Sequence, residues 1–163
     1  MNYAQIRKYD VANGIGVRTT LFVSGCTHNC PMCFNKEYQN FKYGNEWTQE
    51  IEDKFIEYVK DENVVGASIL GGEPLQQDAY TLYKLLKRIK LETGKNIWLW
   101  TGYEYESLPI EYKPLLLHID VLVDGRFIQD LKSAKLKFRG SSNQRVIDVK
   151  KTLEKGEVVL YLE

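Results

Sequence analysis

The chain has 163 residues, of which 44% are hydrophobic and 27% are charged, as expected for one folded domain. Lys plus Arg and Asp plus Glu both total 22, so neither nucleic acid nor an anionic membrane is expected as the main partner. The sequence has no apolar run of about 18 residues and no apolar stretch after Met1, so we expect no transmembrane helix, no secretory signal and a cytoplasmic location.

Strands are predicted where β-branched and apolar residues gather before Gly or Asp. In chain order they are residues 17–24, 64–70, 96–101 and 119–123, with weaker candidates at 146–149 and 158–162. Apolar residues at helical spacing predict one helix after Thr48 and a second over residues 82–89 that ends near Gly94. A third, shorter helix is predicted between Glu111 and His118.

This alternation of strands and helices indicates an α/β domain with a mostly parallel sheet. Ligand sites in such folds gather at the carboxyl ends of the strands. The four loops after the main strands contain the cysteines, residues 71–74, residues 101–102 and residues 124–127. We therefore expect these four loops to open on the same side of the sheet.

The three cysteines all lie in one short segment, with the spacing Cys26-x3-Cys30-x2-Cys33. Thiolates suit an iron–sulfur cluster or zinc. Three thiolates would leave one iron of a four-iron cube free to bind a substrate. Three alternatives remain: a structural zinc site completed by His28 or His118, a redox pair formed by Cys30 and Cys33, and three ordinary buried thiols.

Two motifs together indicate a family. The cysteine spacing and Gly71-Gly72-Glu73-Pro74, which begins 38 residues after Cys33, resemble the two signatures of radical S-adenosylmethionine enzymes. Residues 13–18 leading into 22–26, with 123–127 and 139–145, resemble the activating proteins of anaerobic ribonucleoside-triphosphate reductase. The resemblance runs from about residue 9 to the end of the chain.

The resemblance implies a 4Fe-4S cluster on Cys26, Cys30 and Cys33, with S-adenosylmethionine bound at the open iron. It implies that Gly71, Gly72 and Glu73 contact the methionine amino group and that Met32 and Phe34 lie near the adenine. A flavodoxin-type donor would supply one electron. The cofactor would then split into methionine and a 5′-deoxyadenosyl radical, which takes a hydrogen atom from a glycine of the reductase large subunit.

Two other functions stay open at this point: activation of a different glycyl-radical enzyme, and a non-catalytic zinc-binding α/β module. The expected fold is a single domain over residues 1–163, a partial (β/α)6 barrel of the radical S-adenosylmethionine type, because a full barrel needs about 250 residues.

Several other residues allow two interpretations. Arg18 is either a surface charge or a group that faces the cysteine loop. Asp124, Arg126, Arg139 and Arg145 form either a salt-bridge network or a site for the cofactor or partner. Trp98 and Trp100 alternate on a predicted strand, which favours packing.

Overall fold

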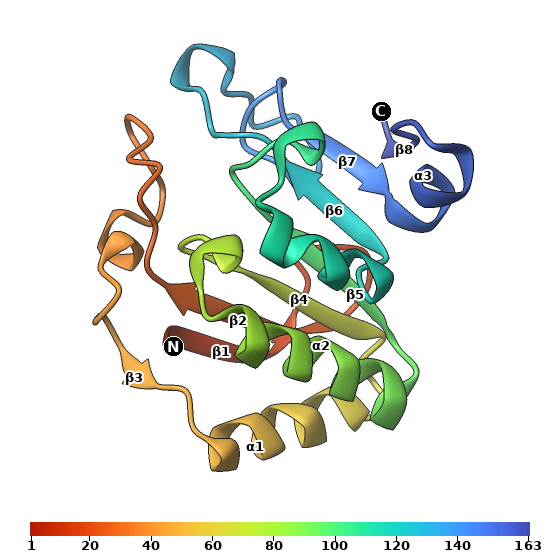
Figure 1. Ribbon diagram of the computed structural model, residues 1–163. Helices are drawn as coiled ribbons and strands as arrows, with labels where there is room; N and C mark the ends of the chain where they lie inside the picture. Colours follow the sequence, from red (N-terminus) through yellow and green to blue (C-terminus); the bar gives the residue numbers. More distant parts are fainter.

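A mixed sheet of eight strands, in the order β3-β1-β2-β4-β5-β6-β7-β8, forms the centre of the molecule (Figure 1). The computed structural model describes residues 1–163. The strands are β1 (Asn2–Asp10), β2 (Arg18–Ser24), β3 (Asn45–Glu46), β4 (Gly66–Gly71), β5 (Asn96–Trp100), β6 (Val121–Asp124), β7 (Arg145–Asp148) and β8 (Leu160–Leu162). The α-helices are α1 (Gln49–Lys60), α2 (Ala79–Thr93) and α3 (Val149–Lys155). Short 3-10 helices are η1 (Lys36–Gln39), η2 (Pro74–Gln76), η3 (Tyr105–Ser107), η4 (Ile110–Leu117) and η5 (Gln129–Leu131).

The parallel part of the sheet is limited to its four central strands, β2, β4, β5 and β6. β1 and β3 on one side, and β7 and β8 on the other, are antiparallel to their neighbours. The predicted α/β class and all six predicted strands are confirmed, with small shifts at their ends. The six β/α units of a partial barrel are not confirmed. An antiparallel neighbour needs no helical crossover, so β7 and β8 add no such unit.

The helices begin and end where capping residues place them. Thr48 caps α1 by accepting a hydrogen bond from the Ile51 N–H, and Gly94 ends α2 in the left-handed conformation at φ +66°, both as predicted. The predicted third helix is present as η4. It is a 3-10 helix that contains Pro114, and proline cannot donate the backbone hydrogen bond of a regular α-helix.

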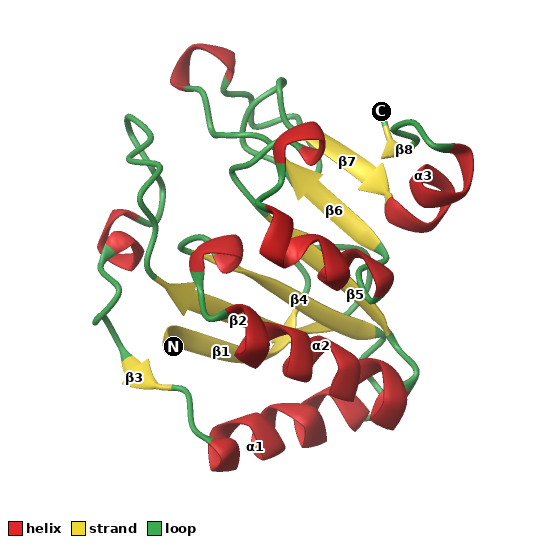
Figure 2. Cartoon of the chain, viewed as in Figure 1, coloured by secondary structure: helices red, strands yellow, loops and turns green.

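The main core lies between the sheet and helices α1 and α2, which cover the same face (Figure 2). Leu21, Ile69 and Leu99 from the strands are fully buried there against Phe55 and Leu86 from the helices. Packing against α1 and α2 holds the central strands in position, and this determines where their carboxyl ends lie. No helix combines the length and the hydrophobicity that a membrane crossing needs.

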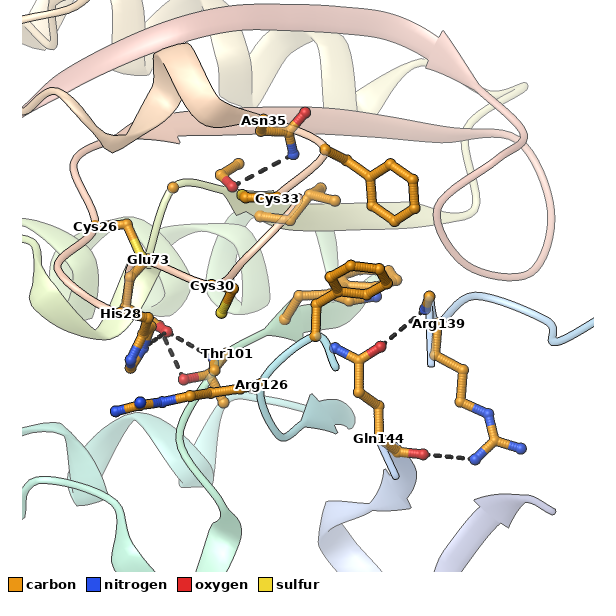
Figure 3. Close-up of a pocket in the computed structure, with 18 of the residues that line it drawn as sticks. Cys26, His28, Cys30, Cys33, Asn35, Glu73, Thr101, Arg126, Arg139 and Gln144 are labelled. Atoms are coloured by element: carbon orange, nitrogen blue, oxygen red, sulfur yellow. Dashed lines mark hydrogen bonds and ion pairs between the residues drawn. The ribbon is translucent and has the colours of Figure 1, made fainter. Parts of the chain in front are cut away.

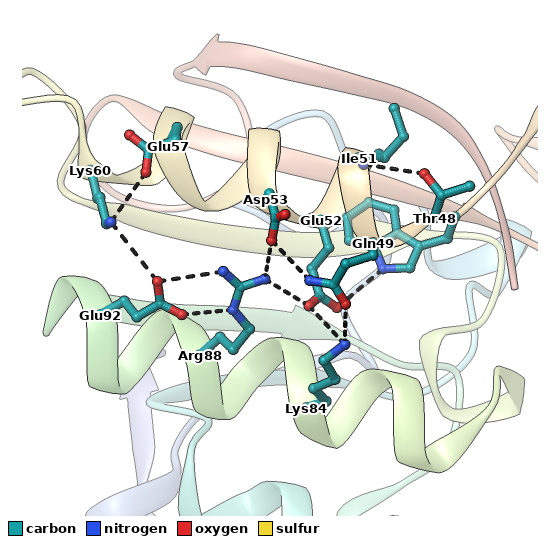
Figure 4. A network of polar contacts seen from close by, with 11 residues as sticks. Thr48, Gln49, Ile51, Glu52, Asp53, Glu57, Lys60, Lys84, Arg88 and Glu92 are labelled. Carbon is teal, nitrogen blue, oxygen red and sulfur yellow. Dashed lines mark hydrogen bonds and ion pairs between the residues drawn. The ribbon is translucent and has the colours of Figure 1, made fainter.

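Polar side chains join α1 to α2 above this core (Figure 4). Arg88 binds Glu52 at 2.9 Å, Asp53 at 2.8 Å and Glu92 at 2.6 Å. Lys84 adds a contact of 3.5 Å to Glu52, whose side chain is buried. Most of the positive charge on α2 is therefore neutralised within the molecule.

The opposite face of the sheet holds a smaller core and a buried arginine. Trp98 packs there with Val121, Val123 and Val146, as the packing interpretation predicted. Arg18 is neither a surface charge nor a neighbour of the cysteine loop, because it lies buried at the start of β2, the far end from that loop. Its guanidinium donates to Ser68 Oγ and to carbonyl and amide oxygens, and burial lowers the pKa of Arg18 to about 10.

Candidate functional site

A cavity of about 530 Å³ opens where the carboxyl ends of the central strands meet. Its walls come from all four loops that the sequence placed on one side of the sheet (Figure 3). They include the three cysteines, residues 71–73, residues 101–102 and residues 125–127. The predicted convergence of these loops is therefore confirmed.

The cysteine loop leaves β2 and turns twice before it reaches η1. Asn29 and Met32 both adopt the left-handed conformation, at φ +52° and +58°, and the Cys33 N–H donates to the Cys30 carbonyl at 3.2 Å. All three thiols are free, half-buried and on the cavity wall. The turns thus bring three soft ligands to one surface.

The protein alone disfavours the thiolate forms of Cys26 and Cys30. Burial raises the pKa of the Cys26 thiol to about 11. Burial also raises the pKa of Cys30, with Cys33 adding to the effect, while the Phe127 N–H and the Arg126 guanidinium oppose it. Metal ions deprotonate the thiols that they bind, so positive metal centres are the partners that this set of ligands requires.

Backbone hydrogen bonds fasten the cysteine loop to the loop after β4. The Gly25 carbonyl accepts from the Glu73 N–H at 2.7 Å and from Gln77 Nε2 at 3.0 Å. The Gly72 N–H donates to the Val23 carbonyl at 2.8 Å. A Cβ atom on Gly72 would lie 2.6 Å from the Gly25 oxygen, so only glycine allows the two loops to approach this closely.

Glu73 occupies the centre of this junction and is only 1% exposed. Its Oε1 accepts from His28 Nε2 and from the Gly102 N–H, both at 2.6 Å. Its Oε2 accepts from Thr101 Oγ1 at 2.8 Å and from the Leu75 N–H at 2.9 Å.

Four donors therefore fill the acceptor positions of the Glu73 carboxylate. Glu73 borders the cavity, as predicted, but its carboxylate is committed to the protein. The predicted contact between Glu73 and the methionine amino group stays a prediction, and it would need one of these four acceptor positions to be freed. Glu73 ties together the loops after β2, β4 and β5.

The zinc alternative lacks a fourth ligand. His28 Nε2 is held by Glu73, and the His28 ring packs edge-on against Tyr103 at 4.7 Å. His118 lies after η4 and packs against Tyr83, away from the cavity. No three His, Cys, Asp or Glu side chains converge on a point where one metal ion could sit.

The loop after β6 forms the opposite wall of the cavity. The predicted charge network separates into two parts. Arg145 pairs with Asp124 at 2.6 Å and with Glu106 at 2.6 Å. Arg126 and Arg139 instead line the cavity, and neither forms an ion pair.

The two predicted adenine neighbours lie on different cavities. Phe34 lines the first cavity, and its ring lies 4.9 Å from that of Phe127. Met32 is 73% exposed and lines a neighbouring cavity of about 890 Å³, which shares Cys30 and Phe127 with the first. His28, Thr101 and Arg126 complete the site. The sequence analysis considered Arg126 for the cofactor or partner and His28 for zinc, but it gave Thr101 no role beyond its position in the loop after a strand.

Comparison with known proteins agrees with this geometry. A family model described as a 4Fe-4S single cluster domain matches residues 12–147, which include all three cysteines. A protein of Escherichia coli (strain K12), the anaerobic ribonucleoside-triphosphate reductase-activating protein, is 45% identical over 150 residues, which cover 90% of this chain and 97% of that protein. This chain belongs to the family of anaerobic ribonucleoside-triphosphate reductase-activating proteins.

Other members of the family are similarly related. The activating protein of Vibrio cholerae serotype O1 is 45% identical over 148 residues, covering 88% of this chain and 96% of its own length. That of Enterobacteria phage T4 is 36% identical over 148 residues, covering 90% and 93%. The family resemblance stated from the motifs is confirmed, and the 4Fe-4S domain supports an iron–sulfur interpretation of the cysteines.

The residues at this site fit a four-iron cluster. The cavity wall presents three soft sulfur ligands, burial raises the pKa of the Cys26 and Cys30 thiols so that a metal would be needed to deprotonate them, and the nearby histidine is held by Glu73.

Proposed function

We propose that this chain activates an anaerobic ribonucleoside-triphosphate reductase by generating a glycyl radical on its large subunit. In this proposal Cys26, Cys30 and Cys33 hold a 4Fe-4S cluster, and S-adenosylmethionine binds beside it. The observation that carries the proposal is that three thiols, with no fourth, share a cavity with the Gly71–Gly72 loop in a member of this family. When bound, the cluster supplies the electron that splits the sulfonium cofactor into methionine and the 5′-deoxyadenosyl radical that takes hydrogen from glycine.

The Gly71–Gly72 backbone is the part of the second motif that we assign to the methionine amino group. The Gly72 carbonyl accepts no hydrogen bond from the chain, and the Gly71 carbonyl has a long side-chain contact of 3.5 Å from Asn35 Nδ2. An ammonium group offers three donors, which suits these oxygens. Glu73 then acts indirectly, by holding the loop that presents them.

Arg126 and Arg139 are the groups that we assign to the cofactor carboxylate. Both line the cavity, and neither is neutralised by a carboxylate of the chain. A guanidinium binds a carboxylate through two parallel hydrogen bonds, which fixes its orientation as well as its position. Orientation matters here because an electron must reach one particular carbon–sulfur bond.

Phe34 and Met32 are the apolar groups that we assign to the adenine. The Phe34 and Phe127 rings form an apolar wall of the first cavity, and such a wall favours an aromatic base over water. Met32 is exposed on the neighbouring cavity, where its flexible thioether can pack on a ring edge. A flavodoxin-type protein is the proposed electron donor. The cytoplasm, which keeps thiols reduced, is the proposed location.

The test is to reconstitute the chain with iron and sulfide without oxygen and mix it with the reductase, S-adenosylmethionine and a reductant. The expected result is a glycyl radical signal in electron paramagnetic resonance, with methionine and 5′-deoxyadenosine as products. Formate acetyltransferase in place of the reductase should give no signal. A colourless protein that binds one zinc and leaves the cofactor intact would refute the proposal.

A further inference from the structure

Positive charge is concentrated in the segment between β6 and β7. We name as the basic lip the cations Arg126, Lys132, Lys135, Lys137 and Arg139. The same stretch contains one carboxylate, Asp130, so its net charge is +4. The whole chain is neutral, and the rest of it therefore carries −4.

The charges of the basic lip are not neutralised within the molecule. None of its five cations lies within ion-pair distance of a carboxylate, and the ion pairs nearest in sequence belong to Arg145. On α2, by contrast, Lys84, Arg88 and Lys90 all pair with acidic residues. Unpaired like charges on one segment create a lasting positive potential that attracts acidic partners.

The basic lip lies beside a predicted cluster ligand. In Figure 1 the light-blue segment after β6 extends beyond the sheet on the same side as the orange segment that contains the cysteines. Lys132 Nζ lies 5.0 Å from the centre of the Phe34 ring, and Phe34 in turn contacts Phe127. The backbone N–H of Phe127 lies next to the Cys30 thiol, and both residues line the two cavities. The basic lip is thus an outer surface from which an electron would have a short path through Phe127 to Cys30.

Apolar groups lie among these charges. Ile128 and Leu131 are exposed on the same segment, and Phe34, 64% exposed, contacts Phe127 and Lys132 of this segment. An apolar centre with a charged rim is the usual composition of a small, transient protein interface. Charge complementarity in such interfaces mainly raises the rate of encounter.

We propose that the basic lip is the docking surface for an acidic one-electron carrier protein that reduces the cluster. The inference rests on the proposed function and names where its electron enters. In this step the carrier loses one electron and the cluster gains it, and no bond is formed or broken. The lip suits a carrier better than the reductase, because a hydrogen atom must be taken inside the cavity whereas an electron can pass through Phe127 and Cys30 from outside.

The test uses a double variant, Lys135→Glu with Lys137→Glu, which brings the net charge of the segment to zero. Neither lysine lines either of the two cavities at the site. The matched control, Lys150→Glu with Lys151→Glu, makes the same change on exposed residues of α3. All proteins are reconstituted without oxygen and checked for equal iron content.

Cluster reduction is followed by stopped-flow absorbance with two reductants: an acidic flavodoxin in its reduced form, and photoreduced deazaflavin, which is small and uncharged. With flavodoxin at low salt we expect the lip variant to be slower by about tenfold or more and the control to match the unmodified chain. The difference should shrink at 1 M salt, where charges are screened within about 3 Å. With deazaflavin all three proteins should react equally.

Several results would overturn the proposal. If flavodoxin reduces the cluster of the lip variant as fast as that of the control, the basic lip is not the docking surface. An equal loss with both reductants would show that the cluster itself was altered. Normal reduction with loss of glycyl radical formation would assign the lip to the reductase. If the unmodified chain fails to cleave S-adenosylmethionine even with deazaflavin, the proposed function fails and the docking proposal falls with it.

Discussion

Replacing Glu73 by Gln should destabilise the folded chain, because no orientation of the amide can satisfy the donors around it. The carboxylate accepts from two donors at each oxygen, and each pair includes one backbone N–H, that of Gly102 or that of Leu75. His28 can change tautomer and the Thr101 hydroxyl can rotate, but a backbone N–H can do neither. Whichever way the amide turns, one buried N–H faces an NH₂ group.

The size of the effect follows from these contacts. An unsatisfied buried donor costs about 1–3 kcal/mol, and the remaining bonds lose the strength that a charged acceptor gives them. We therefore expect the free energy of unfolding to fall by about 2–4 kcal/mol, a large part of the roughly 5–15 kcal/mol that holds a typical domain together.

The assay is urea unfolding of the metal-free chain without oxygen, followed by circular dichroism. The matched control is Glu57→Gln, which removes the same charge from an exposed α1 residue whose partner is Lys60. That change should stay within about 0.5 kcal/mol. If Glu73→Gln unfolds within about 0.5 kcal/mol of the unmodified chain, the four-donor junction does not stabilise the fold and the reasoning is refuted.

Three further predictions concern the ligands, the core and one histidine. Cys33→Ser should leave well under half of the roughly four irons per chain expected after reconstitution, and iron and sulfide analysis showing full content would contradict the cluster assignment. Leu86→Ala should lower the free energy of unfolding by about 2–5 kcal/mol in denaturant titrations, because Leu86 is fully buried, whereas Leu91→Ala on an exposed position should change it little. Burial, with Lys87 and Lys90, lowers the pKa of His118 from 6.5, so the unfolded chain binds more protons below that pH and stability should fall as the pH drops from 6.5 toward the lower folded pKa. His118→Phe should remove this part of the pH dependence in unfolding titrations, and an unchanged slope would show that another group causes it.

The strands and the loop cluster were predictable because each depends on local sequence. Buried strands such as 64–70 stand out as apolar runs, and their carboxyl ends must meet once the strands are parallel. Strand direction at the sheet edge was not predictable. Residues 146–149 were predicted as a strand without a direction, and only the pairing of β7 with β6 shows that this strand runs antiparallel. β1 was missed because its Arg7, Lys8 and Tyr9 are exposed and break the apolar signal.

At the site, the sequence pointed to candidate ligands but not to their supports. Cysteine spacing is a local property, so Cys26, Cys30 and Cys33 could be proposed as ligands directly from the sequence. The surroundings of Glu73 depend on His28 and Thr101, which lie 45 and 28 residues away and reach it only through the fold. The sequence could therefore show that Glu73 can accept hydrogen bonds, but not that the protein already uses all of them.

The hydrogen bonds at Glu73 and Gly25 affect how the proposed metal centre would assemble, because they order part of the cysteine loop before metal binds. Hydrogen bonds within the chain, among them those of the Gly25 carbonyl with Glu73 and Gln77, hold the start of the cysteine loop, so folding provides part of the entropy cost of ordering it. A zinc finger, in contrast, collapses when its metal leaves. Here air that destroys the cluster would leave a folded scaffold ready to be refilled. If the chain holds the proposed cluster, damage by oxygen would then be a repairable loss of metal instead of a loss of the polypeptide.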